Sequence, residues 1–194
     1  MRLILTGIIV LVIASMAASA SPVSKAIGPF NITFDLNTTL KYNVTAEDAQ
    51  ETSSSWIYQM LIQTDNRTAA QISIIRYKNL TDSTLSIGKI LIEQSMSLMG
   101  FSRNISSIDM LKGSYKGFIF TGMNTAGIRL FRAYYWLDSI DCECGPVTVG
   151  KTEIGVISTY PLNESASLIK SLHVKLPGKR WTRCHASSLR LNRR

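Results

Sequence analysis

Apolar and polar residues alternate along residues 30–44, and this alternation limits the fold more than any other feature of the chain. Seven even-numbered positions are apolar: Phe30, Ile32, Phe34, Leu36, Leu40, Tyr42 and Val44. A period of two is typical of a β-strand that buries one face and exposes the other to water. We therefore expect two strands around a turn at Asn37-Thr38-Thr39, within an antiparallel sheet that is half exposed.

Other segments rich in β-branched and aromatic residues predict further strands. Residues 55–63 and 69–77 flank a short polar connection, so they should pair as a hairpin. A second hairpin should form across residues 123–126. The remaining strands are expected at residues 107–111, 115–121, 127–137 and 152–159.

Two segments carry apolar residues at helical spacing. The first helix can be capped by Asp82 and should end at Gly100, with Phe101 as the apolar residue that often follows such a glycine. Its apolar positions are Ile87, Ile90, Leu91, Leu98 and Met99. The second helix should be capped by Asn163, after Pro161 has ended the preceding strand. Its apolar side is expected to carry Ala166, Ile169 and Leu172.

The order of these elements is strands, hairpin, helix, hairpin, strand and helix, which predicts an α+β fold. We expect a mainly antiparallel sheet with two helices packed on it, in a single domain over residues 30–176. Residues 21–29 should form a linker. Residues 177–194 should form a basic, flexible tail, because Pro177 and Gly178 break any element that reaches them.

Five of the segments combine into a pattern found in a known family. They are the opening strand at residues 30–34, the helix at 82–99, the strands with Tyr115-Lys116-Gly117-Phe118 and Tyr134-Tyr135-Trp136, and the Tyr160-Pro161 turn before the last helix. In this combination residues 30–176 resemble the PsbP-like α/β/α sandwich family. The resemblance implies a non-catalytic binding or assembly protein and supplies no catalytic residues. The Cys142-Glu143-Cys144-Gly145 segment departs from the common pattern of that family.

Residues 1–20 have the features of a secretory leader. Arg2 supplies the positive charge, residues 3–18 are apolar, and Ala18-Ser19-Ala20 forms a cleavage signal of small residues. We expect cleavage after Ala20 and a secreted or extracytoplasmic protein. The alternative is an uncleaved N-terminal anchor, although the apolar run of about 16 residues is shorter than the roughly 20 that span a bilayer.

Seven of the nine asparagines lie in Asn-x-Ser/Thr triplets, the acceptor sequence for N-glycosylation. They are Asn31, Asn37, Asn43, Asn66, Asn79, Asn104 and Asn163. Together with the leader, this enrichment predicts a glycoprotein whose glycans point into water. The alternative interpretation is that these asparagines are turn residues in a chain rich in serine and threonine. In its leader and acceptor sites the chain is similar to secreted archaeal proteins that are rich in such triplets.

Positive charge is concentrated at the C-terminus. The chain has 21 basic and 13 acidic residues, and seven of the basic ones, with no acidic one, fall within residues 175–194. The rest of the chain is nearly neutral, so we expect no specific nucleic-acid surface. The tail is expected either to make a weak, salt-dependent contact with an anionic surface or to remain solvated.

Residue types that bind metals are concentrated in residues 138–144. They are Asp138, Asp141, Cys142, Glu143 and Cys144. Thiolates bind zinc and similar soft divalent metals, and His173, Cys184 or His185 could complete a site if the fold brings them close. Structural zinc sites usually separate paired cysteines by two or more residues, so we expect no cofactor and keep zinc as the alternative. The main expectation is a disulfide that involves at least one of Cys142, Cys144 and Cys184.

Aromatic residues 134–136, with Arg129 and Arg132 upstream, could form a face that stacks on sugars or bases. Alternate residues of a strand point to opposite faces, however, so Tyr134 and Trp136 should lie on one side and Tyr135 on the other. Packing of all three in the core is therefore the favoured interpretation.

The chain contains no Gly-x-Ser-x-Gly elbow, His-Glu-x-x-His helix or phosphate-binding glycine loop. His173 is the one histidine before the tail, and we expect it at the surface rather than in a catalytic site. The sequence therefore predicts a non-catalytic binding or scaffold protein whose partner is an envelope protein or polymer. The alternative is an extracellular metal-binding or thiol-active protein that uses Cys142 and Cys144.

Overall fold

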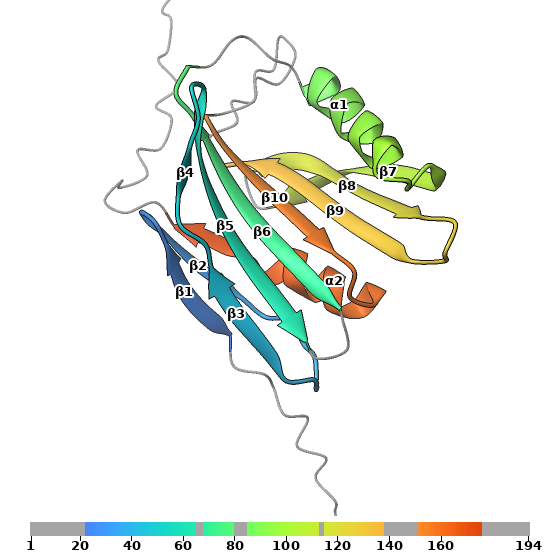
Figure 1. Ribbon diagram of the computed structural model, residues 1–194, viewed down its shortest axis with the longest axis horizontal. Helices are drawn as coiled ribbons and strands as arrows, with labels where there is room; N and C mark the ends of the chain where they lie inside the picture. Colours follow the sequence, from blue (N-terminus) through green and yellow to red (C-terminus); the bar gives the residue numbers. More distant parts are fainter. Residues whose placement is uncertain (1–21, 65–67, 80–84, 113–114, 138–150, 176–194) are drawn as a thin grey trace, which may run out of the picture.

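The computed structural model describes five stretches of the chain, which contain two helices and eleven strands (Figure 1). The described residues are 22–64, 68–79, 85–112, 115–137 and 151–175. All pairings between the described strands are antiparallel. The expected α+β fold, with a mainly antiparallel sheet and two helices, is therefore confirmed.

Most strands belong to one eight-stranded sheet. Its order is β3 (Tyr42–Ala46), β5 (Ser55–Thr64), β6 (Ala69–Tyr77), β10 (Thr152–Ser158), β9 (Arg129–Trp136), β8 (Tyr115–Met123) and β7 (Arg103–Lys112), and β4 (Gln50–Glu51) pairs with β5 beside β3. Both predicted hairpins, β5 with β6 and β8 with β9, are confirmed. Strand β10 joins the two hairpins because it pairs with β6 on one side and β9 on the other.

The N-terminal strands form a separate three-stranded sheet. In it, β2 (Phe30–Phe34) lies between β1 (Val23–Ile27) and β11 (His173–Lys175). Residues 21–29, expected as a linker, thus contain a strand of the fold. The chain turns from β1 into β2 at Gly28, whose φ is 52°. A Cβ at this position would lie 2.3 Å from the ring of Tyr58, so glycine is required for both its conformation and its size.

The two strands expected within residues 30–44 both form, but they do not belong to the same sheet. The apolar residues of β2 face the core, as the alternation predicts, while β3 pairs with the edge of β5. The connection between them, residues 35–41, contains Asn37 with φ 51°. The backbone N–H of Asn37 donates to Asp35 Oδ1 at 2.8 Å. This segment therefore carries the chain from one sheet to the other instead of closing a hairpin.

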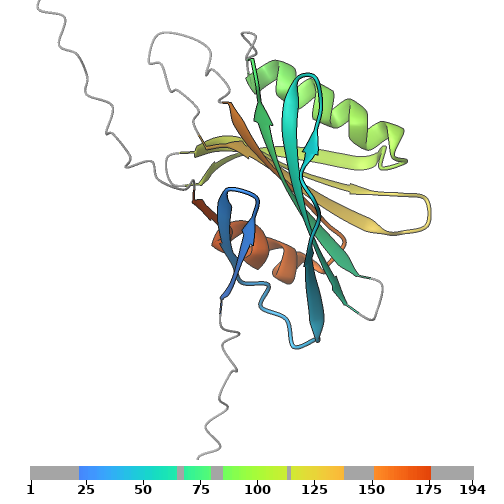
Figure 2. The same ribbon diagram turned by 60° about the vertical axis from the view of Figure 1, so that its left-hand side comes forward.

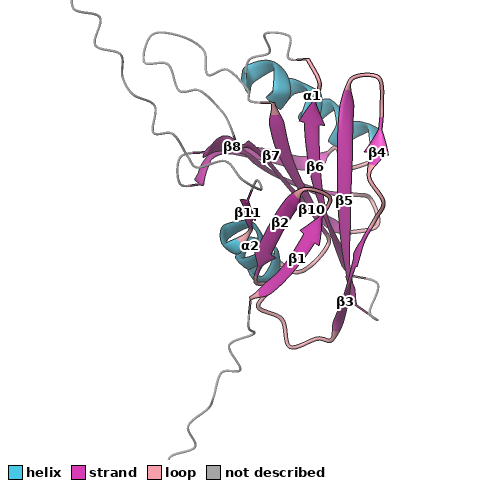
Figure 3. Ribbon diagram, turned by 90° about the vertical axis from the view of Figure 1, so that its left-hand side faces the viewer, coloured by secondary structure: helices cyan, strands magenta, loops and turns pink. Residues whose placement is uncertain are grey.

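The molecule has three layers (Figures 2 and 3). Helix α1 (Leu85–Leu98) lies on one face of the eight-stranded sheet, and the three-stranded sheet with α2 (Leu162–Ser171) lies on the other. Two hydrophobic clusters fill the spaces between the layers. The larger one lies beneath the three-stranded sheet and α2, and the smaller one beneath α1.

Strand β9 contributes to both clusters. Every residue from Leu130 to Leu137 is buried. Tyr134 and Trp136 belong to the cluster beneath α1, whereas Tyr135 belongs to the opposite cluster, where its ring stacks on Tyr115 with centroids 5.8 Å apart. The aromatic residues of β9 are therefore core residues, as expected from the alternation of a strand.

Helix α1 ends as the sequence predicts but buries a different side. Gly100 has φ 80°, and the N–H of buried Phe101 donates to Met96 O at 3.0 Å, which closes the helix. The buried side carries Ile92 and Met96. The prediction that Leu91 and Leu98 lie on the buried side is wrong, because their side chains are 59% and 90% exposed. The expected cap, Asp82, lies outside the described residues.

The approach of α1 to the sheet explains this difference. Gly88 faces the ring of Trp136, where an added Cβ would lie 3.4 Å away. The side of α1 that contacts the sheet thus includes Gly88, which has no side chain. A search for large apolar residues at helical spacing does not detect such a residue.

Helix α2 begins two residues earlier than expected and is held at its C-terminal end. Pro161 is the N-cap residue without a side-chain hydrogen bond, so Asn163 lies inside the first turn instead of capping it. The expected apolar residues Ile169 and Leu172 are buried. At the other end, Lys112 of β7 donates from Nζ to the carbonyl oxygen of Ile169 at 2.6 Å. Burial lowers the pKa of Lys112 to about 8.

Replacement of Gly117 tests the packing of β8 against β9. A Cβ on Gly117 would lie 1.9 Å from the carbonyl oxygen of Tyr134, so Gly117→Ala should reduce the free energy of unfolding by about 3 kcal/mol or more. Gly88→Ala is the matched control, since its Cβ meets Trp136 at an ordinary contact distance and alanine favours the helix. Urea unfolding of both variants checks the prediction, and similar losses in the two would contradict it.

Candidate binding surface

Helix α1 covers only part of its face of the large sheet. Its buried side packs on β8 and β9, through residues such as Phe118, Phe120 and Leu130. The strand register places the next side chains of this face on β10, β6 and β5. They are Glu153 and Ile157, then Gln71, Ser73 and Ile75, then Ile57, Gln59 and Leu61. All of them are partly exposed, and no other described helix lies over them (Figure 1).

Two leucines of α1 border this open face. Lys89 lies over the ring of Phe118 at 5.7 Å, so that side of the helix faces β8. Ser95 lies on the β9 side, where its Oγ accepts a hydrogen bond from Arg132 Nη1 at 2.6 Å. With 3.6 residues per turn, Leu91 and Leu98 lie beyond Ser95 and away from β8. The exposed leucines and the open strands thus lie next to one another on the same face of the sheet.

A polar cluster lies at the inner corner of this surface. Arg132, only 8% exposed, donates from Nη2 to the hydroxyl of Tyr134, and its Nη1 also lies 3.7 Å from Met99 Sδ. Tyr77 donates its hydroxyl proton to Glu153 Oε2 at 2.8 Å. Among the residues that the structure describes, Arg132 Nε has no hydrogen-bond acceptor. This Nε is itself buried, so the corner contains one unsatisfied donor beneath the surface.

Burial has a direct effect on the protonation of this cluster. It raises the pKa of Glu153, while the hydrogen bond from Tyr77 and the charge of Arg132 act in the opposite direction. The pKa of Tyr77 is also raised, first by burial and then by the carboxyl group of Glu153. Burial likewise raises the pKa of Tyr134. The hydroxyl groups of Tyr77 and Tyr134 therefore remain neutral at ordinary pH.

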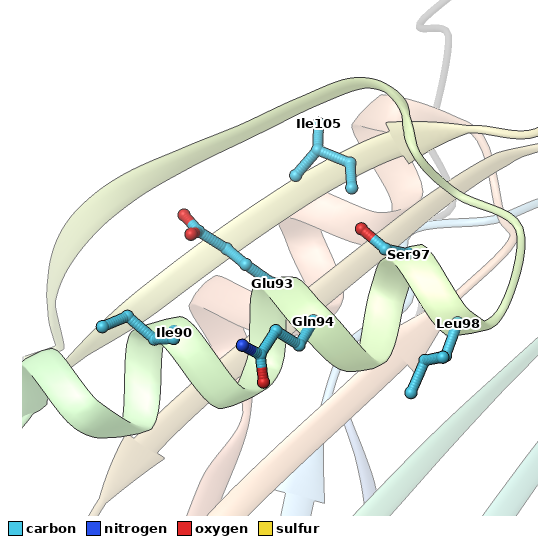
Figure 4. Close-up of a pocket in the computed structure, with 6 residues that line it drawn as sticks. All are labelled: Ile90, Glu93, Gln94, Ser97, Leu98 and Ile105. Atoms are coloured by element: carbon cyan, nitrogen blue, oxygen red, sulfur yellow. The ribbon is translucent and has the colours of Figure 1, made fainter.

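A shallow groove of about 900 Å³ follows the outer side of α1 (Figure 4). Three aliphatic residues, Ile90, Leu98 and Ile105, line it together with Glu93, Gln94 and Ser97. Ile105 comes from β7 and the other five from α1. The groove therefore lies between the outer side of α1 and β7.

The predicted metal and disulfide residues are mostly outside the described part of the chain. Asp138, Asp141, Cys142, Glu143, Cys144 and Cys184 all fall there. His173 is described and is exposed in β11, where it pairs with Thr33. Within the described ranges, no three His, Cys, Asp or Glu side chains come together as a possible metal site.

The acceptor asparagines lie at the surface wherever the structure describes them. Asn31, Asn37, Asn43, Asn79, Asn104 and Asn163 are exposed, and Asn66 is outside the described residues. Asn124, which has no acceptor triplet, is only partly exposed. Its Oδ1 accepts hydrogen bonds from the N–H groups of Ala126 and Ile128 and so shapes the turn between β8 and β9. One triplet has a structural role as well, because Ser165 is buried and donates to the carbonyl oxygen of Tyr160.

The polar corner could not be identified from the sequence alone. Arg132 was visible as a basic residue beside aromatic ones, but Tyr77 and Glu153 are far apart in the chain and meet only through the pairing of β6 with β10. The one local signal is a glutamate at position 153 within an otherwise apolar strand.

No protein-family model matches the chain, and comparison with curated proteins and with solved structures also gives no match. Neither α1 nor α2, the helices of the described ranges, is long and apolar enough to cross a membrane.

The pKa of Glu153 has a consequence for stability. Because the pKa of Glu153 is raised in the folded protein, protonation of this carboxyl group stabilises the fold. The stabilisation is full below 4.5, the pKa in the unfolded chain, and it is lost as the pH rises through the higher pKa of the folded protein. The free energy of unfolding of the wild type, minus that of Glu153→Gln, should therefore decline as the pH rises above 4.5. Urea unfolding across this range measures the difference.

Tyr77→Phe is the companion variant for this test. It removes the hydrogen bond that lowers the pKa of Glu153, so the decline should move to higher pH. A wild-type profile parallel to that of Glu153→Gln at every pH would show that this carboxyl group is not perturbed by the fold.

Proposed function

We propose that this chain is a secreted or envelope-associated, non-catalytic binding or scaffold protein that recognises a partner protein through the open face of the sheet beside α1. One observation carries the proposal. Among the described residues, eight large apolar side chains are exposed, and four of them belong to α1 and the turn that follows it. These four are Ile90, Leu91, Leu98 and Met99. Apolar side chains gathered at one place on a surface are typical of interaction sites.

The dimensions of the open face favour a helix as the bound element. Strands in a sheet lie about 4.8 Å apart, so β5, β6 and β10 span roughly 10 Å between their outer axes, close to the diameter of one helix. A helix in this position would lie alongside α1 on the same face of the sheet. Leu91 and Leu98 would then contact its flank.

The chemistry of the open face favours an amphipathic helix with an uncharged apolar side. Aliphatic residues such as Leu61, Ile75 and Ile157 alternate with amide and hydroxyl groups, and the one carboxyl group of this face, Glu153, is engaged by Tyr77. A charged contact side on the partner would lose hydration here without gaining an ion pair.

The location outside the cytoplasm is supported by the leader and by the exposure of the acceptor asparagines. The finer fold assignment, a PsbP-like sandwich, is part of the same proposal. It is supported by the presence of a helix on each face of the large antiparallel sheet. A binding or assembly role is what that family resemblance implies.

Charged residues on α1 test this proposal. A double variant, Leu91→Glu with Leu98→Glu, should weaken partner binding at least about tenfold, because two buried carboxylates oppose an apolar contact. Both positions are exposed in the free protein, so the melting temperature should change little. The control is Leu162→Glu on α2, which is 56% exposed and lies on the opposite side of the sheet.

The partner itself is identified by photo-cross-linking in the native host, with the cross-linking residue at position 98 or 162. We expect one protein to be captured from position 98 alone, through a helical segment, and its capture to be lost in the Leu91 and Leu98 double variant. Equal capture from both positions, or capture that survives the two glutamates, would contradict the proposed surface.

A further inference from the structure

The eight-stranded sheet has two edges, and a strand at an edge pairs with another strand on one side only. The ten-residue strand β7 ends the sheet on one side, and β3 ends it on the other. Along an edge, alternate backbone N–H and C=O groups have no strand partner within the sheet, and they can pair with the edge of another molecule. Proteins oppose such association with charges, prolines, bulges or covering groups.

The side chains of β7 do little to prevent another strand from pairing with this edge. It contains no proline, and its middle part, Ser107 to Met110, carries a single charge, on Asp109. Ile108 in this part is 65% exposed. The cationic group of Lys112 does not guard the edge, because it is directed to the carbonyl oxygen of Ile169 in α2. A long edge with an exposed isoleucine is a site at which association is expected.

Each edge strand carries one exposed acceptor asparagine. Asn43 lies in β3, opposite Gln63 of β5. Asn104 lies in β7, at an irregularity in the pairing between Arg103 and Ser106, and has φ 57°. The five interior strands β5, β6, β10, β9 and β8 contain no acceptor asparagine. Within the large sheet, the acceptor sites are thus confined to the two strands at which another chain could add.

We propose that N-glycans on Asn43 and Asn104 prevent two copies of this chain from pairing through the edges of the large sheet. This role rests on the export and glycosylation that belong to the proposed function. An added strand must approach to about 4.8 Å along its whole length. A hydrated glycan attached to the edge strand occupies this space and would have to be displaced. At Asn104 the irregular pairing adds to the effect by twisting the edge.

The test compares two ways of removing the same glycans from the full chain, expressed in a host that glycosylates it. One edge variant combines Asn43→Gln with Asn104→Gln. The other combines Thr45→Ala with Ser106→Ala, which keeps both asparagines but removes both acceptor triplets. Ser106 also contacts Thr121 at 2.6 Å, so the two variants perturb the protein differently and share only the loss of the glycans.

The control is Asn31→Gln with Asn163→Gln. It removes two glycans from β2, the middle strand of the small sheet, and from α2. Glycopeptide masses measure the occupancy of every site, and light scattering after size exclusion measures the fraction of dimers and larger species.

In both edge variants we expect the associated fraction to rise by at least about tenfold, while the control changes by less than about twofold. The proposal is overturned if Asn43 and Asn104 carry no glycan in the wild type, if the edge variants remain monomeric, or if the control associates equally. Cross-linking from position 98 is measured separately, so failure of the glycan role is distinguishable from failure of the binding surface. Bare asparagines at all seven sites would instead argue against export itself.

Discussion

The burial of β9 on both faces is the constraint on which the rest of the structure depends. Most strands of an antiparallel sheet can expose one face, but here Tyr134 and Trp136 require a cover on one side and Tyr135 on the other. Helix α1 supplies the first cover, and α2 with the three-stranded sheet supplies the second. Gly117 of β8 allows the close approach that this packing needs, because any side chain there would meet the backbone of β9.

The same constraint explains why the sheet is covered unevenly. One helix is enough to shield β8 and β9, so the neighbouring strands β10, β6 and β5 keep side chains of mixed polarity that tolerate partial exposure. Arg132 and Glu153 lie where the hydrophobic cluster beneath α1 meets the open strands, and each makes a hydrogen bond with a tyrosine hydroxyl. The polar corner is therefore the boundary of the hydrophobic cluster under α1, and this boundary gives the proposed binding surface its shape.

Much of the local structure could be predicted because its signals are local. The hairpins, the glycine stop of α1 and the alternation in β9 each depend on neighbouring residues, and all three are confirmed. Other features depend on contacts between distant residues. The pairing of β2 with β1 and β11 brings together both ends of the domain, and nothing within residues 30–44 distinguishes this pairing from a hairpin with β3. The contact side of α1 was mistaken because Gly88, rather than a large apolar residue, marks it.

The two outermost elements of the described domain, β1 at its beginning and β11 at its end, lie on either side of the same strand, β2 (Figure 3). The polypeptide therefore enters and leaves through one layer, and helix α1 belongs to the layer farthest from it. If either terminus tethers the protein to a membrane or wall, the point of attachment lies in the small sheet. The large sheet would then separate this point from the leucines of α1.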